Sequence, residues 1–154
     1  MTMPSRLNLA LVFNNLGDVR KVVAEVLGHY SARVERWQII DRDNLIDLSA
    51  DSVQFAVCAR KSVLVVTNLD PRVRAHFSRQ GRFDVLTVSL EKGLQHLVAT
   101  ANALAQLEGV KAAGIGEELE VDLESADFPG FIGDDITMLK ASSNGFLTSD
   151  DAKP

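Results

Sequence analysis

The chain has one cysteine, one tryptophan and one tyrosine among its 154 residues. A single cysteine excludes an intramolecular disulfide, and the three histidines do not form a zinc-binding pattern with it. No apolar run approaches the roughly 20 residues that cross a bilayer, and no charged-then-apolar leader opens the sequence. These absences predict a cytoplasmic protein that binds no metal or other cofactor and does not associate with a membrane.

The composition that remains is that of a globular domain, with 46% hydrophobic and 24% charged residues. The net charge of −5 does not favour nucleic acid as a partner. This charge is unevenly distributed, because residues 1–107 carry +3 and residues 108–154 carry −8. We therefore predict an α/β body over 1–109, an acidic docking arm of the same domain over 110–140, and a partly disordered tail over 141–154.

The first forty residues alternate between two strand patterns and one helix pattern. Residues 7–13 and 33–40 are apolar runs of strand length. Between them, valine and leucine recur at the helical period over 19–27. Asn15 is the expected N-cap of this helix, with Asp18 at the third position.

The next segments predict more sheet and a second clear helix. The β-branched runs 53–59 and 62–66 are typical of a hairpin, and 84–88 of a further strand. Ser89 is the expected cap of a helix whose apolar stripe runs over 94–105. This order predicts an α/β sandwich: a mixed sheet of about five to six strands with two or three packed helices, in a ferredoxin-like variant. A three-layer, doubly wound sheet is the alternative.

A basic segment lies between the predicted hairpin and the strand at 84–88. Asp70 followed by Pro71 is typical of a helix start, so a short basic helix is expected to follow. In that helix Arg72, His76 and Arg79 would share one face. The resulting basic docking face comprises Arg60, Lys61, Arg72, Arg74, His76, Arg79 and Arg82.

A ligand site is predicted where the first strand meets the first helix. Open α/β sheets bind ligands at the carboxyl ends of their strands. If the first and fourth strands are parallel neighbours, polar side chains from both gather at that edge. The predicted residues for binding an anionic small molecule or nucleotide are Asn14, Asn15, Asp18, Asn68 and Arg72.

The segment from Glu117 to Asp135 carries eight acidic residues and no lysine or arginine. Its first part alternates acidic and aliphatic residues at the strand period. Neighbouring carboxylates on one face are then too far apart to coordinate the same metal ion. Its aliphatic and aromatic content is not that of a disordered tail. We therefore predict an arm that docks, in cis or in trans, through Leu119, Val121, Leu123, Phe128, Phe131 and Ile132.

The sequence holds no recognisable catalytic constellation, so an interaction function is favoured over an enzymatic one. The leading hypothesis is a non-enzymatic interaction or regulatory module that self-associates, most simply as a dimer, with the 117–140 arm docked on its own body or a neighbour. The alternative is an anion-binding domain or enzyme that uses Arg72. An RNA-binding module built on the basic 60–82 region is the third hypothesis.

Overall fold

The structure, a computed structural model, describes residues 6–14, 17–80, 83–94, 96–122, 130–140 and 147–148. Within these ranges the chain forms nine strands and three α-helices. The strands are β1 (Arg6–Asn14), β2 (Val34–Asp41), β3 (Asn44–Leu48), β4 (Val63–Thr67), β5 (Val73–Gln80), β6 (Phe83–Glu91), β7 (Val110–Asp122), β8 (Gly130–Lys140) and β9 (Leu147–Thr148). The helices are α1 (Val19–Gly28), α2 (Val53–Cys58) and α3 (Leu97–Ala105), and a 3-10 turn, η1 (Ala50–Ser52), precedes α2.

All nine strands belong to one sheet in the order β3-β2-β4-β5-β6-β1-β7-β8-β9. Every neighbouring pair is antiparallel except β8 and β9, which are parallel. β4, β5 and β6 form a meander, whereas α1, α2 and α3 are connections that pass over strands placed from elsewhere in the chain. In particular, α3 leads from β6 to β7, and β1 lies between those two strands.

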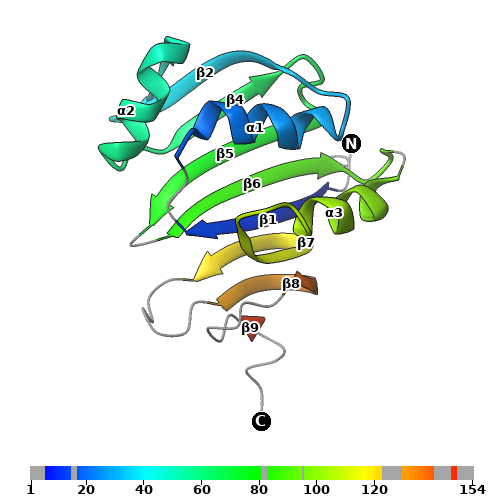
Figure 1. Cartoon of the computed structure of the whole chain (residues 1–154). Helices are drawn as coiled ribbons and strands as arrows, with labels where there is room; N and C mark the ends of the chain where they lie inside the picture. Colours follow the sequence, from blue (N-terminus) through cyan, green and yellow to red (C-terminus); the bar gives the residue numbers. More distant parts are fainter. Residues whose placement is uncertain are drawn as a thin grey trace.

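The three helices cover one face of this sheet (Figure 1). In the central strand β1, Leu9 and Leu11 pack with helix residues in the main core. Ala10 and Val12 point to the opposite face because strand side chains alternate, and there they join a smaller buried cluster that includes Leu119. Within the described residues the sheet therefore has a helix-covered face and a face without helices, called the helix-free face below.

These features confirm an α/β fold with a sheet and three helices, and six of the expected elements are present as β1, α1, β2, β4, β6 and α3. The expected sheet of five to six strands is wrong, because nine strands pair. The ferredoxin-like variant is not confirmed. A doubly wound sheet is excluded, because the neighbouring strands in its body are antiparallel.

The segment expected as the first strand of a hairpin, residues 53–59, contains the helix α2 instead. Its buried residues Val53, Ala56 and Val57 are spaced at i, i+3 and i+4, and Phe55 between them is 78% exposed. That spacing follows the helical period, and it outweighs the preference of the β-branched residues for a strand.

Arg60 and Lys61 end this helix rather than forming a hairpin turn. The backbone N–H of Lys61 donates to the carbonyl of Ala56 at 2.9 Å, and that of Arg60 to Val57 at 2.9 Å. Arg60 has a φ of 61°, the left-handed conformation of a helix-ending Schellman motif.

The expected basic helix is the strand β5. Val73, Ala75 and Phe77 are buried on the helix-covered face, and Arg74 between them lies on the other face. This strict alternation is the strand period, and β5 pairs with β4 and β6 along its length. The dipeptide Asp70–Pro71 lies in the turn before the strand, so it does not start a helix.

Two helix starts also differ from the expectation. The N-cap of α1 is Asp18, whose Oδ1 accepts a hydrogen bond from the backbone N–H of Lys21 at 3.3 Å; Asn15 lies outside the described residues. Ser89 belongs to β6, and α3 begins at Leu97 with His96 as its N-cap residue.

The acidic C-terminal third contributes strands to the same sheet. β7 pairs with β1 on one side and with β8 on the other, with irregularities around Gly114 and Glu117. Residues 110–122 and 130–140 thus extend the sheet that the body begins. Of the expected tail, Leu147–Thr148 is described, as β9.

Candidate functional site

The basic residues between Arg60 and Arg82 do not share one surface. Because β5 is a strand, Arg74 and His76 lie on the helix-free face, whereas Arg79 lies on the helix-covered face. The other members are dispersed: Arg60 and Lys61 follow α2, Arg72 lies in the turn before β5, and Arg82 falls outside the described residues.

Of the five residues expected to form one anion site, the four that the structure describes are also separated. Three antiparallel pairings lie between β1 and β4, so these strands run in opposite directions. Asn14 and Asp18 are therefore at one end of the sheet, and Asn68 and Arg72 are at the other. Asn68 has a structural partner, since its Oδ1 accepts a hydrogen bond from the backbone N–H of Arg33 at 2.7 Å.

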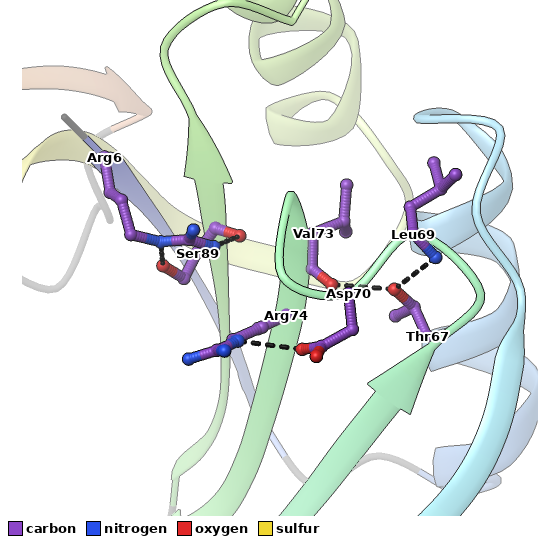
Figure 2. Close-up of polar contacts among 7 residues, drawn as sticks. All are labelled: Arg6, Thr67, Leu69, Asp70, Val73, Arg74 and Ser89. Carbon is purple, nitrogen blue, oxygen red and sulfur yellow. Dashed lines mark hydrogen bonds and ion pairs between the residues drawn. The ribbon is translucent and has the colours of Figure 1, made fainter. Parts of the chain in front are cut away.

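The turn between β4 and β5 is organised around Thr67, as Figure 2 shows. Thr67 is 3% exposed, and its hydroxyl donates to the carbonyl of Val73 at 2.7 Å and accepts from the N–H of Leu69 at 3.1 Å. The N–H of Arg72 donates to the carbonyl of Leu69 at 2.7 Å. These bonds hold Leu69 and Arg72 in defined positions.

Two arginines, from β5 and β1 on either side of β6, make polar contacts at the same end of the sheet (Figure 2). The Nε of Arg74 donates to Oδ1 of Asp70 at 2.8 Å, within the turn. The guanidinium of Arg6 in β1 donates to the hydroxyl of Ser89 at 2.7 Å and to its carbonyl at 3.0 Å. Both arginines are thus engaged in structural contacts.

A pocket of about 360 Å³ opens beside this turn, between the end of α1 and the start of α3. Its volume lies within the range of roughly 300–1,000 Å³ that is typical of small-molecule sites. The lining residues are His29, Tyr30, Ser31, Leu69, Arg72, Leu94, His96 and Thr100. This pocket brings together three segments that are distant in the sequence.

Arg72 supplies the permanent positive charge of this pocket. Its Nε lies 3.3 Å from Oε2 of Glu91, and the backbone N–H of Glu91 donates to the carbonyl of Arg72 at 3.0 Å. The side chain of Arg72 is still 53% exposed. Glu91 therefore orients the guanidinium without burying it.

Tyr30 forms part of the pocket wall and is 8% exposed. Its hydroxyl is buried and has no hydrogen-bond partner among the described residues. Burial raises the pKa of this phenol far above its usual value, so the hydroxyl keeps its proton.

A buried ion pair lies at the other end of β5. The Nε and Nη2 of Arg79 donate to the two carboxylate oxygens of Asp84 at 2.7 and 3.3 Å, and Nη1 donates to Sγ of Cys58 at 3.7 Å. The hydrogen bonds to Asp84 raise the pKa of the Arg79 guanidinium. Cys58 is exposed at the end of α2.

His76 lies in the middle of the helix-free face. It is paired across the sheet with Leu64 of β4 and Thr87 of β6. Burial between these strands lowers the pKa of its imidazole, which favours the neutral form.

The hairpin of β2 and β3 exposes apolar side chains on both faces of the sheet. Ile40 and Leu45 are directly opposite each other and are 49% and 59% exposed. On the other face Ile39 is opposite Ile46, which is 41% exposed. β3 is the edge strand at one end of the sheet order, so it has one neighbouring strand, β2, within the described residues.

The structure describes part of the predicted docking arm. Leu119 is buried in the cluster on the helix-free face of its own chain. Val121 lies in β7, and Phe131 and Ile132 lie in β8, but their side chains are outside the described set. Leu123 and Phe128 fall outside the described residues altogether.

The part of the chain that the structure describes holds neither a cluster of metal-binding side chains nor a membrane-spanning helix. Its histidine, cysteine, aspartate and glutamate side chains form no group of three or more that could hold a metal ion. No helix among the described residues is long and apolar enough to cross a membrane. Comparisons with protein-family models, curated proteins and solved structures find no match.

Proposed function

We propose that this protein is a cytoplasmic, non-enzymatic interaction module that forms a dimer through the edge strand β3. The observation that carries the proposal is the pair of exposed aliphatic residues Leu45 and Ile46, which lie on opposite faces of that strand. A strand that is apolar on both faces is typical of a sheet interior and not of a free edge.

Apart from the charge of Asp47, the edge lacks the features that usually prevent strand pairing. Protected edges carry lysine, proline or a bulge, whereas β3 reads Asn-Leu-Ile-Asp-Leu and pairs with β2 without a register shift. The outer backbone groups of β3 therefore offer a template for another strand. Because Leu119 of the acidic arm is buried in its own chain, the proposed partner surface is this edge and not the arm.

A two-fold axis through Ile46 gives the simplest arrangement. Two copies of β3 would run antiparallel, with Ile46 opposite Ile46 of the second copy and Leu45 opposite Asp47. No like charges then face each other across the join. The main aliphatic contacts would come from Leu45 and Ile46, each desolvated by the partner strand.

Light scattering after size-exclusion chromatography tests this interface. We expect the wild-type chain to be a dimer and Ile46→Lys to be a folded monomer whose unfolding midpoint no longer depends on protein concentration. Val98→Lys is the matched control, since Val98 is a 55% exposed aliphatic residue on α3, and it should leave the dimer intact. A monomeric wild-type chain, or an Ile46→Lys variant that stays dimeric, would disprove the proposal.

Disulfide capture tests the register directly. In a Cys58→Ser background, Ile46→Cys should form a covalent dimer on mild oxidation, because directly opposite residues bring their Cβ atoms to about 4.5–5.5 Å. Asn44→Cys lies on the same edge, but in this register it faces residue 48 of the second copy, four residues away from that copy's residue 44. The Asn44→Cys variant should therefore form no covalent dimer under the same conditions. Equal cross-linking of both variants would contradict the two-fold register.

A further inference from the structure

We propose that the pocket between α1, the β4–β5 turn and α3 binds a small phosphomonoester, a function independent of the β3 edge. The pocket shares no residue with β3, and its about 360 Å³ exceeds what an inorganic ion alone would fill. The ligand class follows from the donors, the charge and the apolar wall that these three segments bring together.

Arg72 is the anchor for the phosphate. Within the described part of the chain only its Nε is engaged, by Glu91 at 3.3 Å, so the terminal nitrogens are available to a ligand. A guanidinium presents paired N–H donors that match two phosphate oxygens. The contact with Glu91 fixes the direction of the side chain, which lowers the entropy lost on binding.

The remaining polar groups suit an acceptor with three terminal oxygens. His29 and His96 contribute imidazole nitrogens, and Ser31 and Thr100 contribute hydroxyls. A carboxylate offers two oxygens to these donors and a phosphate offers three. This number of donors from three segments favours a phosphate ester over a simple carboxylate.

The start of α3 adds backbone donors at the same place. His96 precedes the first turn of this nine-residue helix, and its side chain forms no capping hydrogen bond. The first N–H groups of a helix have no partner within the helix, and they favour anions. Because His96 itself lines the pocket, this end of α3 belongs to the site.

The end of α1 also reaches the pocket, and helix C-termini repel anions. Here two of its terminal carbonyls are occupied. The N–H of Ala32 donates to the carbonyl of Leu27 at 3.0 Å, and that of Ser31 to Gly28 at 3.0 Å. This Schellman motif weakens the negative end of α1 where it meets the ligand.

The apolar part of the lining predicts an organic substituent on the phosphate. Leu69, Leu94 and the ring of Tyr30 form this part of the wall. A sugar or short carbon skeleton would cover them and exclude water from the Arg72 contact. Inorganic phosphate should therefore bind more weakly than its esters.

Isothermal titration calorimetry with ribose 5-phosphate, ribose and inorganic phosphate tests the site on the full chain. We expect ribose 5-phosphate to bind, inorganic phosphate to bind at least about 10-fold more weakly, and ribose not to bind at about 10 mM. No heat from either phosphate compound at about 10 mM would overturn the proposal.

Variants separate this pocket from general attraction to positive charge. Arg72→Met should weaken ribose 5-phosphate binding by about 10- to 100-fold. Arg72→Lys should weaken it by less, because lysine keeps the positive charge but lacks the paired N–H donors of the guanidinium. Arg20→Met is the matched control, since Arg20 is also a part-exposed arginine paired with carboxylates, those of Asp51 and Asp18. Equal losses in the Arg20 and Arg72 variants, or unchanged binding by a folded Arg72→Met protein, would refute the site.

Discussion

Replacing Thr67 with valine tests how the β4–β5 turn is held. The change keeps the β-branched shape of a buried strand residue and removes only the hydroxyl. That hydroxyl makes two hydrogen bonds, to the carbonyl of Val73 and from the N–H of Leu69. A buried polar group that loses its partner costs about 1–3 kcal/mol, and an ordinary hydrogen bond contributes a net of about 1 kcal/mol.

From these values we expect Thr67→Val to lower the free energy of unfolding by about 2 kcal/mol. For a chain of this length each kcal/mol corresponds to about 2–4 °C, so the melting temperature should fall by about 4–8 °C. Urea unfolding followed by circular dichroism gives the free energy. The single tryptophan, Trp37, is buried in the main core and provides an independent fluorescence signal.

Thr87→Val is the matched control for this experiment. Thr87 is a half-buried strand residue on β6, and its hydroxyl has no hydrogen bond among the described residues. Its replacement should be neutral or slightly stabilising. If both valine variants unfold at the wild-type urea midpoint, Thr67 does not organise the turn, and the fixed position assigned to Arg72 loses its basis.

Three further changes have defined outcomes. Arg60→Gly should raise the free energy of unfolding by about 0.5–1 kcal/mol, because glycine adopts the left-handed conformation without strain. Ala59 has an ordinary φ of −82°, so Ala59→Gly should lower the free energy of unfolding. Urea midpoints of the two variants test this difference. The lowered pKa of His76 means that the unfolded chain binds the proton more readily, so stability present above about pH 6.5 is lost as the pH falls towards the folded-state pKa. His76→Gln should therefore reduce the loss of stability between about pH 7.5 and 5.5, and an unchanged slope would contradict this origin. His96→Gly should stabilise the chain slightly and weaken ribose 5-phosphate binding, measured by unfolding and calorimetry, and a gain in affinity would argue against a role for the imidazole.

The sequence is sufficient to predict elements wherever one period dominates. The apolar run of β1 and the helical apolar stripe of α1 are examples, because the residues of each pattern are the ones that the fold buries. In β5 the strict alternation of Val73, Ala75 and Phe77 outweighs the cap-like Asp70–Pro71 pair, which predicts a helix. In α2 the helical spacing of the buried residues outweighs the β-branched composition, which predicts a strand.

The order of the strands is not a local property and could not be predicted in this way. β1 pairs with β6 and β7, which come some 70 and 100 residues later, so its neighbours depend on global packing. The pocket has the same origin. Arg72 was predicted as an anion-binding residue, but nothing near it in sequence links it to His29 or His96, which the fold brings to the same site.

The backbone conformation of His96 supports its assignment to the pocket. Four of the five non-glycine residues with positive φ belong to motifs that need this conformation. Ser31 and Arg60 end helices in Schellman motifs, and Arg42 and Asp43 form the two-residue turn between β2 and β3. His96 is different, because an N-cap residue is normally extended and this one has a φ of 55°. A glycine would remove the strain but also the imidazole, so a histidine at this strained position agrees with the proposed role of its side chain in the pocket.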